Sequence, residues 1–529
     1  MAGEAGGPEI AWGVMRDGVG LCADVYRPGV GRGPWPVLLA RTPYGRRDPG
    51  VLARLEPGGA AGRGFVVVVQ DVRGRGDSGG VWEPLVGEGA DGYDTVRWAA
   101  RLPGADGRVV MYGPSYLGHT QWAALGARPP ELVAAVPEFT WAEPRDGLVA
   151  RGGAAERGLL AQWTLGLGHE VLSRAHAADP AARARALDEL ARAREGLDAG
   201  DWDPQALRAL PLPGRPGGPP LPAVPADHRA LPATPTLTVA GWYDAFLQGS
   251  LDNYTAARAA GHPAALIVGP WTHDDQAGRT PGYDFGPAAD AAALDGGPSL
   301  RARTLTWLRA VLDGAPPAGP PVLVHVMGAG EWRALDGWPP PARPTAWYLR
   351  AGGPLSTAPP HAGEEPGRFR HDPADPVPTR GGALLLTAAY PAGPHDQRAV
   401  EARGDVLVHT SAPLAAPLEV MGRIRAVLAV AADAGPADWV VRLCDVAPDG
   451  TSRVLADGVL RTAAAGEREV AVDLWSTAHL FRTGHAVRLH VAASSHPRWD
   501  VAGPPGTRTV FRDAARASRL VLPVTAGAV

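Results

Sequence analysis

Three polar residues of the chain have the types and the order that acyl transfer by a serine requires. Ser115 stands in "GPSYLG" (113–118), a serine between two glycines. A serine hydroxyl attacks a carbonyl efficiently only when a histidine accepts its proton and an acid orients that histidine. Asp244 and His273 follow along the chain in the order serine, acid, histidine, one of the orders in which such triads occur. We therefore take these three residues as a candidate catalytic triad.

The segments around the triad candidates read as strands that alternate with helices. Short runs rich in valine and leucine predict strands, and runs with helical spacing predict helices. The strand runs are 35–42, 64–72, 107–113, 234–244 and 263–275, and the helical runs are 91–102 and 300–314. Such alternation favours a largely parallel α/β sheet.

Each triad candidate follows one of these predicted strands. Ser115 lies between a strand run and a helical run, which is the context of a nucleophile elbow, although the usual G-x-S-x-G pattern is lengthened by one residue. The carboxyl ends of parallel strands are where such sheets bind ligands. Two alternatives stay open at this point: Ser115 as an ordinary turn serine, and Asp244 as the N-cap of the next helix.

The remaining segments predict two further parts of the molecule. Region 138–230 reads as a helical insertion, with a strong helix at 180–200 and a proline- and glycine-rich linker at 211–225. After about residue 320, nine short β-prone runs separated by turn residues predict an all-β sandwich or jelly roll. We expect an α/β core (1–137 and 231–319), an inserted helical cap (138–230) and a C-terminal β-domain (320–529).

Composition excludes several classes of partner and cofactor. The net charge of a chain of 529 residues is only −4, and its 51 basic residues are all scattered arginines, so neither nucleic acid nor an anionic membrane is expected as a partner. Cys22 and Cys444 are too far apart for a metal motif or a disulfide framework. Without a signal peptide pattern or an apolar run of about 18 residues, we expect a cytoplasmic protein.

Four motifs resemble the CocE/NonD serine hydrolases, a group that includes cocaine esterase, X-prolyl dipeptidyl aminopeptidases, α-amino acid ester hydrolases and glutaryl acylases. They are "RTPYG" (41–45), "GPSYLG" (113–118), "GWYDAF" (241–246) and "GPWTH" (269–273). The segment 324–339 also resembles the family's entry into its C-terminal β-domain. The resemblance implies an α/β-hydrolase core with an inserted helical cap, followed by a jelly roll, as the segments themselves predict.

The resemblance also implies roles for single residues. Ser115 would be the nucleophile, His273 the base and Asp244 the orienting acid. The phenol of Tyr44 and the backbone N–H of Tyr116 would stabilise the oxyanion. Trp163 and Phe246 are expected to line the acyl pocket, with ordinary core packing as the alternative for both.

The expected activity is therefore cleavage of an ester or amide bond of a small acyl substrate through an acyl-enzyme intermediate, with an esterase as the main interpretation and without a metal or organic cofactor. One alternative is an X-Pro dipeptidyl-peptidase or an α-amino acid ester hydrolase, which needs a carboxylate for the substrate's α-ammonium group. Cap candidates for that carboxylate are Glu143, Asp146, Glu156 and Glu170. The other alternative is a non-catalytic binding protein on a hydrolase scaffold. An exposed face of the β-domain could support a homodimer.

Overall fold

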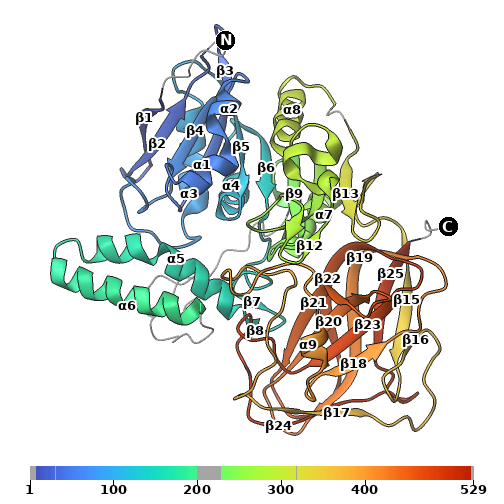
Figure 1. Ribbon diagram of the computed structural model, residues 1–529. Coiled ribbons are helices and arrows are strands. Elements are labelled where there is room, and N and C mark those ends of the chain that lie inside the picture. Colours follow the sequence, from blue (N-terminus) through green and yellow to red (C-terminus); the bar gives the residue numbers. More distant parts are fainter. Residues whose placement is uncertain (1–6, 30, 199–227, 317–318, 526–529) are drawn as a thin grey trace.

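A ten-stranded mixed sheet forms the centre of the N-terminal part of the molecule (Figure 1). The computed structural model describes residues 7–29, 31–198, 228–316 and 319–525. The strands lie in the order β1 (Glu9–Val14), β2 (Gly20–Tyr26), β4 (Val66–Asp71), β3 (Trp35–Thr42), β5 (Ala105–Pro114), β6 (Leu132–Glu138), β9 (Thr236–Tyr243), β10 (Ala264–Thr272), β13 (Val322–Val326) and β14 (Glu331–Leu335). The strands from β4 to β13 pair in parallel, and the pairs at both edges are antiparallel.

Helices cover both faces of this sheet because the parallel strands are apolar on both faces. Leu38, Val110 and Val239 belong to a core cluster under one layer of helices, which consists of α1 (Pro49–Leu55), α2 (Pro57–Ala61) and α8 (Leu300–Leu312). Leu39 and Met111 point to the opposite face, which is covered by α3 (Glu88–Ala99), α4 (Tyr116–Ala127) and α7 (Leu247–Ala259). Successive side chains of each strand point to opposite faces of the sheet, so each strand contributes to two separate hydrophobic cores.

The cap enters between β6 and β9, where the helical insertion was predicted. It consists of a short hairpin, β7 (Ala150–Arg151) and β8 (Ala154–Ala155), and of two helices, α5 (Arg157–Ala175) and α6 (Pro180–Asp198). The two helices pack against each other through leucines and alanines and extend to the left in Figure 1. The predicted linker at 211–225 lies outside the described residues.

The C-terminal β-domain is a sandwich of two antiparallel sheets, as the fold prediction expected. One sheet contains β15 (Ala342–Leu349), β16 (Leu355–Ser356), β17 (Gly367–His371), β19 (Leu418–Ala432), β22 (Gly466–Phe481), β24 (Gly506–Val510) and β25 (Arg519–Thr525). The other contains β18 (Leu407–Thr410), β20 (Ala437–Val446), β21 (Ser452–Thr462) and β23 (Ala486–Ala492). Buried side chains from both sheets form one hydrophobic cluster between them.

Short elements complete the described structure. They are β11 (Arg279–Thr280), β12 (Tyr283–Asp284), α9 (Arg398–Glu401) and three 3₁₀ turns at His228–Ala230, Pro287–Ala289 and Ala291–Gly296.

Two of the β-prone runs assigned to the β-domain are placed differently by the structure. The run 321–328 forms β13, which pairs in parallel with β10 and therefore extends the core sheet. Its composition predicts a strand but says nothing about which sheet it joins. The run 382–387 is an extended loop and not a strand. The run is rich in leucine because it packs against the cap. Leu386 lies so close to helix α5 that a Cβ on Gly158 would be 2.8 Å from its side chain.

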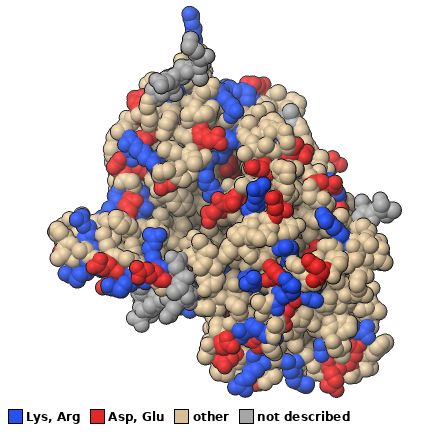
Figure 2. Space-filling view, viewed as in Figure 1, with Lys and Arg blue, Asp and Glu red and all other residues tan. Residues whose placement is uncertain are grey.

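The surface charges fit the low net charge of the chain. On the face shown in Figure 2, arginines and acidic residues are interspersed, without a broad area of one sign. Of the helices that the structure describes, none has the length and apolar character needed to cross a bilayer. Cys22 and Cys444 are buried and free.

Candidate active site

Ser115 lies at a sharp turn between β5 and α4. Its backbone has φ 61° and ψ −125°, a conformation that costs a non-glycine residue about 1–3 kcal/mol. The flanking glycines leave room for the turn. Gly113 has φ 123°, and a Cβ on Gly118 would lie 2.6 Å from the Cβ of Thr140. A strained turn flanked by glycines is the geometry of a nucleophile elbow. An ordinary turn serine would not need this strained conformation.

His273 and Asp244 form a tight pair at the ends of adjacent strands. The Nδ1 atom of His273 lies 2.7 Å from Oδ1 of Asp244, and both side chains are buried. The N-cap alternative for Asp244 is wrong, because Phe246 precedes helix α7 and no side chain caps it. The carboxylate is therefore free to orient the imidazole. Its other oxygen, Oδ2, has no hydrogen-bond partner among the described residues.

The hydroxyl of Ser115 is joined to the phenol of Tyr44. The two oxygens are 3.3 Å apart, and the indole Nε1 of Trp163 donates to the same phenol oxygen at 3.3 Å. Burial raises the pKa of Tyr44, and hydrogen bonds with Ser115, Trp163 and the backbone N–H of Tyr116 lower it by less, so the phenol keeps its proton. As the first residue of α4, Tyr116 also has a backbone N–H without an acceptor inside the helix. Two potential donors therefore meet beside Ser115.

A cavity of about 650 Å³ opens in front of these groups. Ser115, His273, Tyr44 and Trp163 line it, so the structure brings four of the predicted site residues to one surface. Phe246 does not line the cavity. Its ring packs edge-on against the His273 imidazole, with 5.2 Å between the ring centroids, and so supports the histidine from behind.

Sequence reasoning missed one entire wall of the cavity. Helix α1 and its N-cap contribute six residues to the lining: Asp48, Gly50, Val51, Ala53, Arg54 and Leu55. Arg54 also donates to the backbone carbonyl of His273. The opposite wall includes Leu385, from the loop that was predicted as a strand. The D-P-G sequence at 48–50 signals a helix start, but no local pattern places that helix beside Ser115.

A second cavity of about 280 Å³ adjoins the first on the far side of His273. The two cavities share Gln162, His273, Asp274 and Leu385. His273 therefore borders both cavities.

The four cap carboxylates that could bind an α-ammonium group lie outside both cavities: Glu143, Asp146, Glu156 and Glu170. Three of them have partners of their own. Glu143 accepts from the backbone N–H of Arg145 at 3.0 Å. Glu156 accepts from the indole N–H of Trp499 at 2.8 Å, and Glu170 pairs with Arg75 at 2.8 Å, which ties helix α5 to the core. The acidic residues that do line the larger cavity are Asp48 and Asp274, both exposed.

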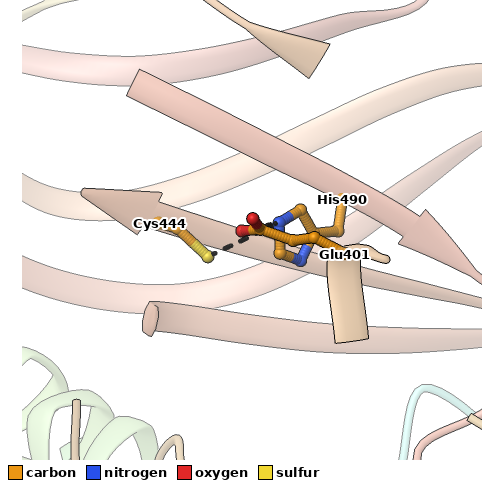
Figure 3. Close-up of side chains that lie close together, drawn as sticks. All are labelled: Glu401, Cys444 and His490. Atoms are coloured by element: carbon orange, nitrogen blue, oxygen red, sulfur yellow. Dashed lines mark hydrogen bonds and ion pairs between the residues drawn. The ribbon is translucent and has the colours of Figure 1, made fainter. Parts of the chain in front are cut away.

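Within the described residues, one cluster has the side-chain types of a metal site: Glu401, Cys444 and His490 of the β-domain (Figure 3). The Nε2 atom of His490 lies 2.9 Å from a Glu401 oxygen, and the other oxygen of Glu401 pairs with Arg488 at 2.5 Å. A second guanidinium, that of Arg442, stands opposite His490 in the sheet. Two positively charged arginines disfavour a bound cation, and the His490–Glu401 hydrogen bond already uses groups that would bind it. The cluster is therefore better explained as a buried polar network than as a metal site.

Taken together, fold and site define a serine hydrolase built on an α/β-hydrolase core. Comparisons with known proteins agree with this class. The family model described as X-Pro dipeptidyl-peptidase (S15 family) matches residues 17–275, and the model of the X-Pro dipeptidyl-peptidase C-terminal non-catalytic domain matches residues 317–521. Cocaine esterase of Rhodococcus sp. (strain MB1 Bresler) is 34% identical over an alignment of 533 positions that covers 92% of this chain and 90% of that protein. The chain therefore belongs to this family of serine hydrolases, to which the CocE/NonD resemblance pointed.

Solved structures support the fold over the whole chain. An aminopeptidase from the marine sediment archaeon Thaumarchaeota archaeon superposes with a TM-score of 0.77 at 23% identity, covering 98% of this chain and 96% of that one. An α-amino acid ester hydrolase superposes with a TM-score of 0.75 at 24% identity, with the same coverage. At these identities the likeness concerns the fold and not the substrate.

Proposed function

We propose that the protein is an esterase that cleaves esters of small acyl groups through an acyl-enzyme formed on Ser115. The observation that carries the proposal is the position of Ser115: a strained elbow on the wall of a cavity, with the Tyr44 phenol 3.3 Å from its hydroxyl and His273 on the same wall. A nucleophile, a base and an oxyanion donor thus face the same space.

In the proposed reaction, the Ser115 hydroxyl attacks the ester carbonyl while Nε2 of His273 accepts its proton. Asp244 holds the imidazole through Nδ1 and stabilises the imidazolium that forms. The carbonyl oxygen becomes an oxyanion and accepts from the Tyr44 O–H and the Tyr116 N–H. His273 then protonates the leaving alcohol. The same steps with water as the nucleophile release the acid.

The hydrogen bond between Ser115 and Tyr44 suggests how substrate starts this sequence. Among the described residues the Ser115 hydroxyl is paired with Tyr44 and not with His273. A substrate carbonyl that accepts from Tyr44 takes its hydrogen bond away from the serine, whose hydroxyl can then turn toward His273. Catalytic hydrogen bonds often tighten only when the complex forms.

Esters are favoured over peptides with a free amino terminus because of the acidic residues. The four cap carboxylates predicted for an α-ammonium group lie outside both described cavities, and three of them have other partners. Asp48 and Asp274 do line the larger cavity, but both are exposed, so neither forms a buried site for an ammonium group. A direct comparison of an α-amino ester with its N-acetylated counterpart tests this. Equal kcat/KM for the two supports a plain esterase, whereas a strong preference for the free amine would favour the α-amino acid ester hydrolase.

Labelling with a fluorophosphonate probe tests the nucleophile. Wild type should be labelled, folded Ser115→Ala should not, and a series of p-nitrophenyl esters should then measure the size of acyl group that the larger cavity accepts. A folded wild-type protein that neither reacts with the probe nor hydrolyses any ester of the series would contradict the proposal and favour a non-catalytic binding protein.

A further inference from the structure

The side chain of Tyr116 lies apart from the cavity, although its backbone N–H is a proposed oxyanion donor. The phenol ring is fully buried and stacks on Trp163, with 6.3 Å between the ring centroids. Its hydroxyl accepts from the Leu85 backbone N–H at 2.8 Å and donates to Oε1 of Glu88 at 2.8 Å. A buried hydroxyl must have such partners, and here they fix the first residue of α4 from its side-chain end.

Glu88 is held from the other side by an arginine. Its second oxygen, Oε2, accepts from Arg41 at 2.7 Å, and both side chains are almost completely buried. The Nε atom of Arg41 donates in turn to the side-chain oxygen of Gln70 at 3.0 Å. Burial raises the pKa of Glu88, and the Arg41 charge and the Tyr116 hydrogen bond only partly offset this. Such a pair is costly to bury, which is a reason to look for its role outside stability.

The network joins the two segments that carry the oxyanion donors. Arg41 is near the end of β3, three residues before Tyr44, and Tyr116 directly follows Ser115. Glu88, the first residue of α3, lies between them. A path of hydrogen bonds therefore runs from the end of β3, three residues before the phenol donor, to the side chain of the residue that carries the amide donor.

We propose that Glu88 and Arg41 are positioning residues of the oxyanion hole and act through the side chain of Tyr116. The inference rests on the proposed function, because it assumes that the Tyr44 and Tyr116 donors serve an oxyanion. Neither residue lines the cavity, so neither touches the substrate. Oxyanion donors act over a narrow range of distances, and a displacement of about 1 Å in a catalytic group can cost roughly 100-fold in rate.

The test compares Tyr116→Phe with Tyr112→Phe. Tyr112 is also fully buried, and its hydroxyl donates to the Leu55 carbonyl at 3.1 Å, so the control loses a similar hydrogen bond in the same part of the chain. In Tyr116→Phe, kcat for p-nitrophenyl butyrate should fall about 10- to 100-fold with KM within about two-fold. The inhibition constant of phenylboronic acid, which forms a tetrahedral adduct with an active-site serine, should rise by the same factor as kcat falls. Tyr112→Phe should change neither quantity by more than about two-fold.

Glu88→Gln shows whether the carboxylate acts through the tyrosine. The amide still accepts from the Tyr116 hydroxyl but loses the ion pair with Arg41, so the fall in kcat should be smaller than in Tyr116→Phe. In the double variant the Glu88→Gln substitution should lower kcat no further, because the connecting hydroxyl is already gone. Circular dichroism and thermal melting identify variants that are folded at the assay temperature.

Two results would overturn the positioning role: folded Tyr116→Phe with wild-type kcat and boronic acid inhibition, or effects of Tyr116→Phe and Glu88→Gln that simply add. Failure of the proposed function would be seen separately, as ester turnover that survives Ser115→Ala.

Discussion

Two clusters in this protein bring together a nucleophile, a histidine and a carboxylate, and they differ in nearly everything else. In the core they are Ser115, His273 and Asp244, with 2.7 Å between the imidazole and the carboxylate. In the β-domain they are Cys444, His490 and Glu401, with 2.9 Å for the corresponding contact and 4.0 Å from Sγ to the ring (Figure 3). By residue type alone, the second set would be a plausible thiol counterpart of the first.

The two nucleophiles differ in their backbone environment and in their access to solvent. Ser115 lies at a strained turn on a cavity, next to the backbone N–H of Tyr116, the first residue of helix α4. Cys444 lies inside β20, between β21 and β23, and is fully buried, although the pairing with β21 shifts register between Leu443 and Cys444. Burial raises the pKa of the Cys444 thiol, so the nucleophilic thiolate does not form. The comparison teaches that a nucleophile, a histidine and an acid are not enough for a catalytic site. The nucleophile must also be accessible to substrate and lie beside oxyanion donors.

Removing the two nucleophiles gives the largest contrast. Ser115→Ala should lower kcat for p-nitrophenyl esters by at least about 10⁴-fold, because no other group in the cavity can form the acyl-enzyme. Cys444→Ala should leave kcat within about two-fold and lower the free energy of unfolding by about 1 kcal/mol through the small void it creates. Steady-state kinetics and urea unfolding measure both. Loss of turnover in a folded Cys444→Ala variant would break the comparison.

Neutralising the two carboxylates should separate activity from stability. Asp244→Asn should lower kcat about 10³- to 10⁴-fold by favouring the wrong imidazole tautomer, and Glu401→Gln should leave kcat unchanged. Glu401→Gln should instead cost about 2 kcal/mol of unfolding free energy near neutral pH, since it weakens charged hydrogen bonds.

The stability difference at Glu401 should depend on pH in a defined direction. Burial raises the pKa of Glu401, but the hydrogen bond from His490 and the charges of His490 and Arg488 outweigh it and hold the pKa below its usual 4.5. A carboxylate with a lowered pKa stabilises the fold above its unfolded-state pKa and loses that contribution as the pH falls through the folded-state value. The difference between wild type and Glu401→Gln should therefore shrink below about pH 4.5. A difference that grows toward acid would contradict this account.

Tyr44→Phe tests the feature that the β-domain cluster lacks altogether, a side-chain oxyanion donor. The variant keeps the ring and loses the O–H beside Ser115, so kcat should fall about 10²- to 10³-fold with little change in KM. Fluorophosphonate labelling should slow but persist, since the nucleophile and base remain. Wild-type kcat in this variant would assign the donor role to another group.

How far the sequence alone could predict this site depends on whether a feature is local. The strand–helix pattern, the elbow at Ser115 and the order of Asp244 and His273 are local or ordered along the chain, and they led to residues that the structure brings together. The strand in 321–328, the loop 382–387 and the wall formed by α1 were misplaced or missed. Each depends on which distant segment it packs against, and hydrophobic periodicity does not contain that information.

The buried network behind Tyr116 was invisible in the sequence for the same reason. Arg41, Glu88 and Tyr116 lie on three separate elements, and only folding brings their polar atoms within hydrogen-bond distance. For Phe246 the sequence left two roles open, a lining residue or core packing, and the structure favours the second. The ring belongs to a core cluster and packs against the His273 imidazole.

Trp163→Phe should give a smaller effect that sharpens the account of Tyr44. The variant keeps an aromatic wall in the cavity and removes the indole N–H that donates to the Tyr44 phenol at 3.3 Å. Without that donor the phenol is less well oriented, and kcat should fall roughly three- to ten-fold. Trp163→Phe in the Tyr44→Phe background should lower kcat no further. An additive loss would instead assign Trp163 a contact with the acyl group.

Treatment with a thiol-alkylating reagent should leave the activity of the folded protein unchanged. Iodoacetamide at pH 7.5 should modify neither Cys22 nor Cys444 in the folded protein, because both are buried and burial raises the pKa of both thiols. Mass spectrometry should find both alkylated once urea unfolds the chain, and ester turnover should be unchanged after native treatment. Cys22→Ala provides a background in which Cys444 is the only thiol. Rapid native alkylation of Cys444 in that background, with loss of turnover, would mean that the β-domain cluster opens to solvent and is tied to the reaction. The distinction between an accessible and a sealed nucleophile would then no longer hold.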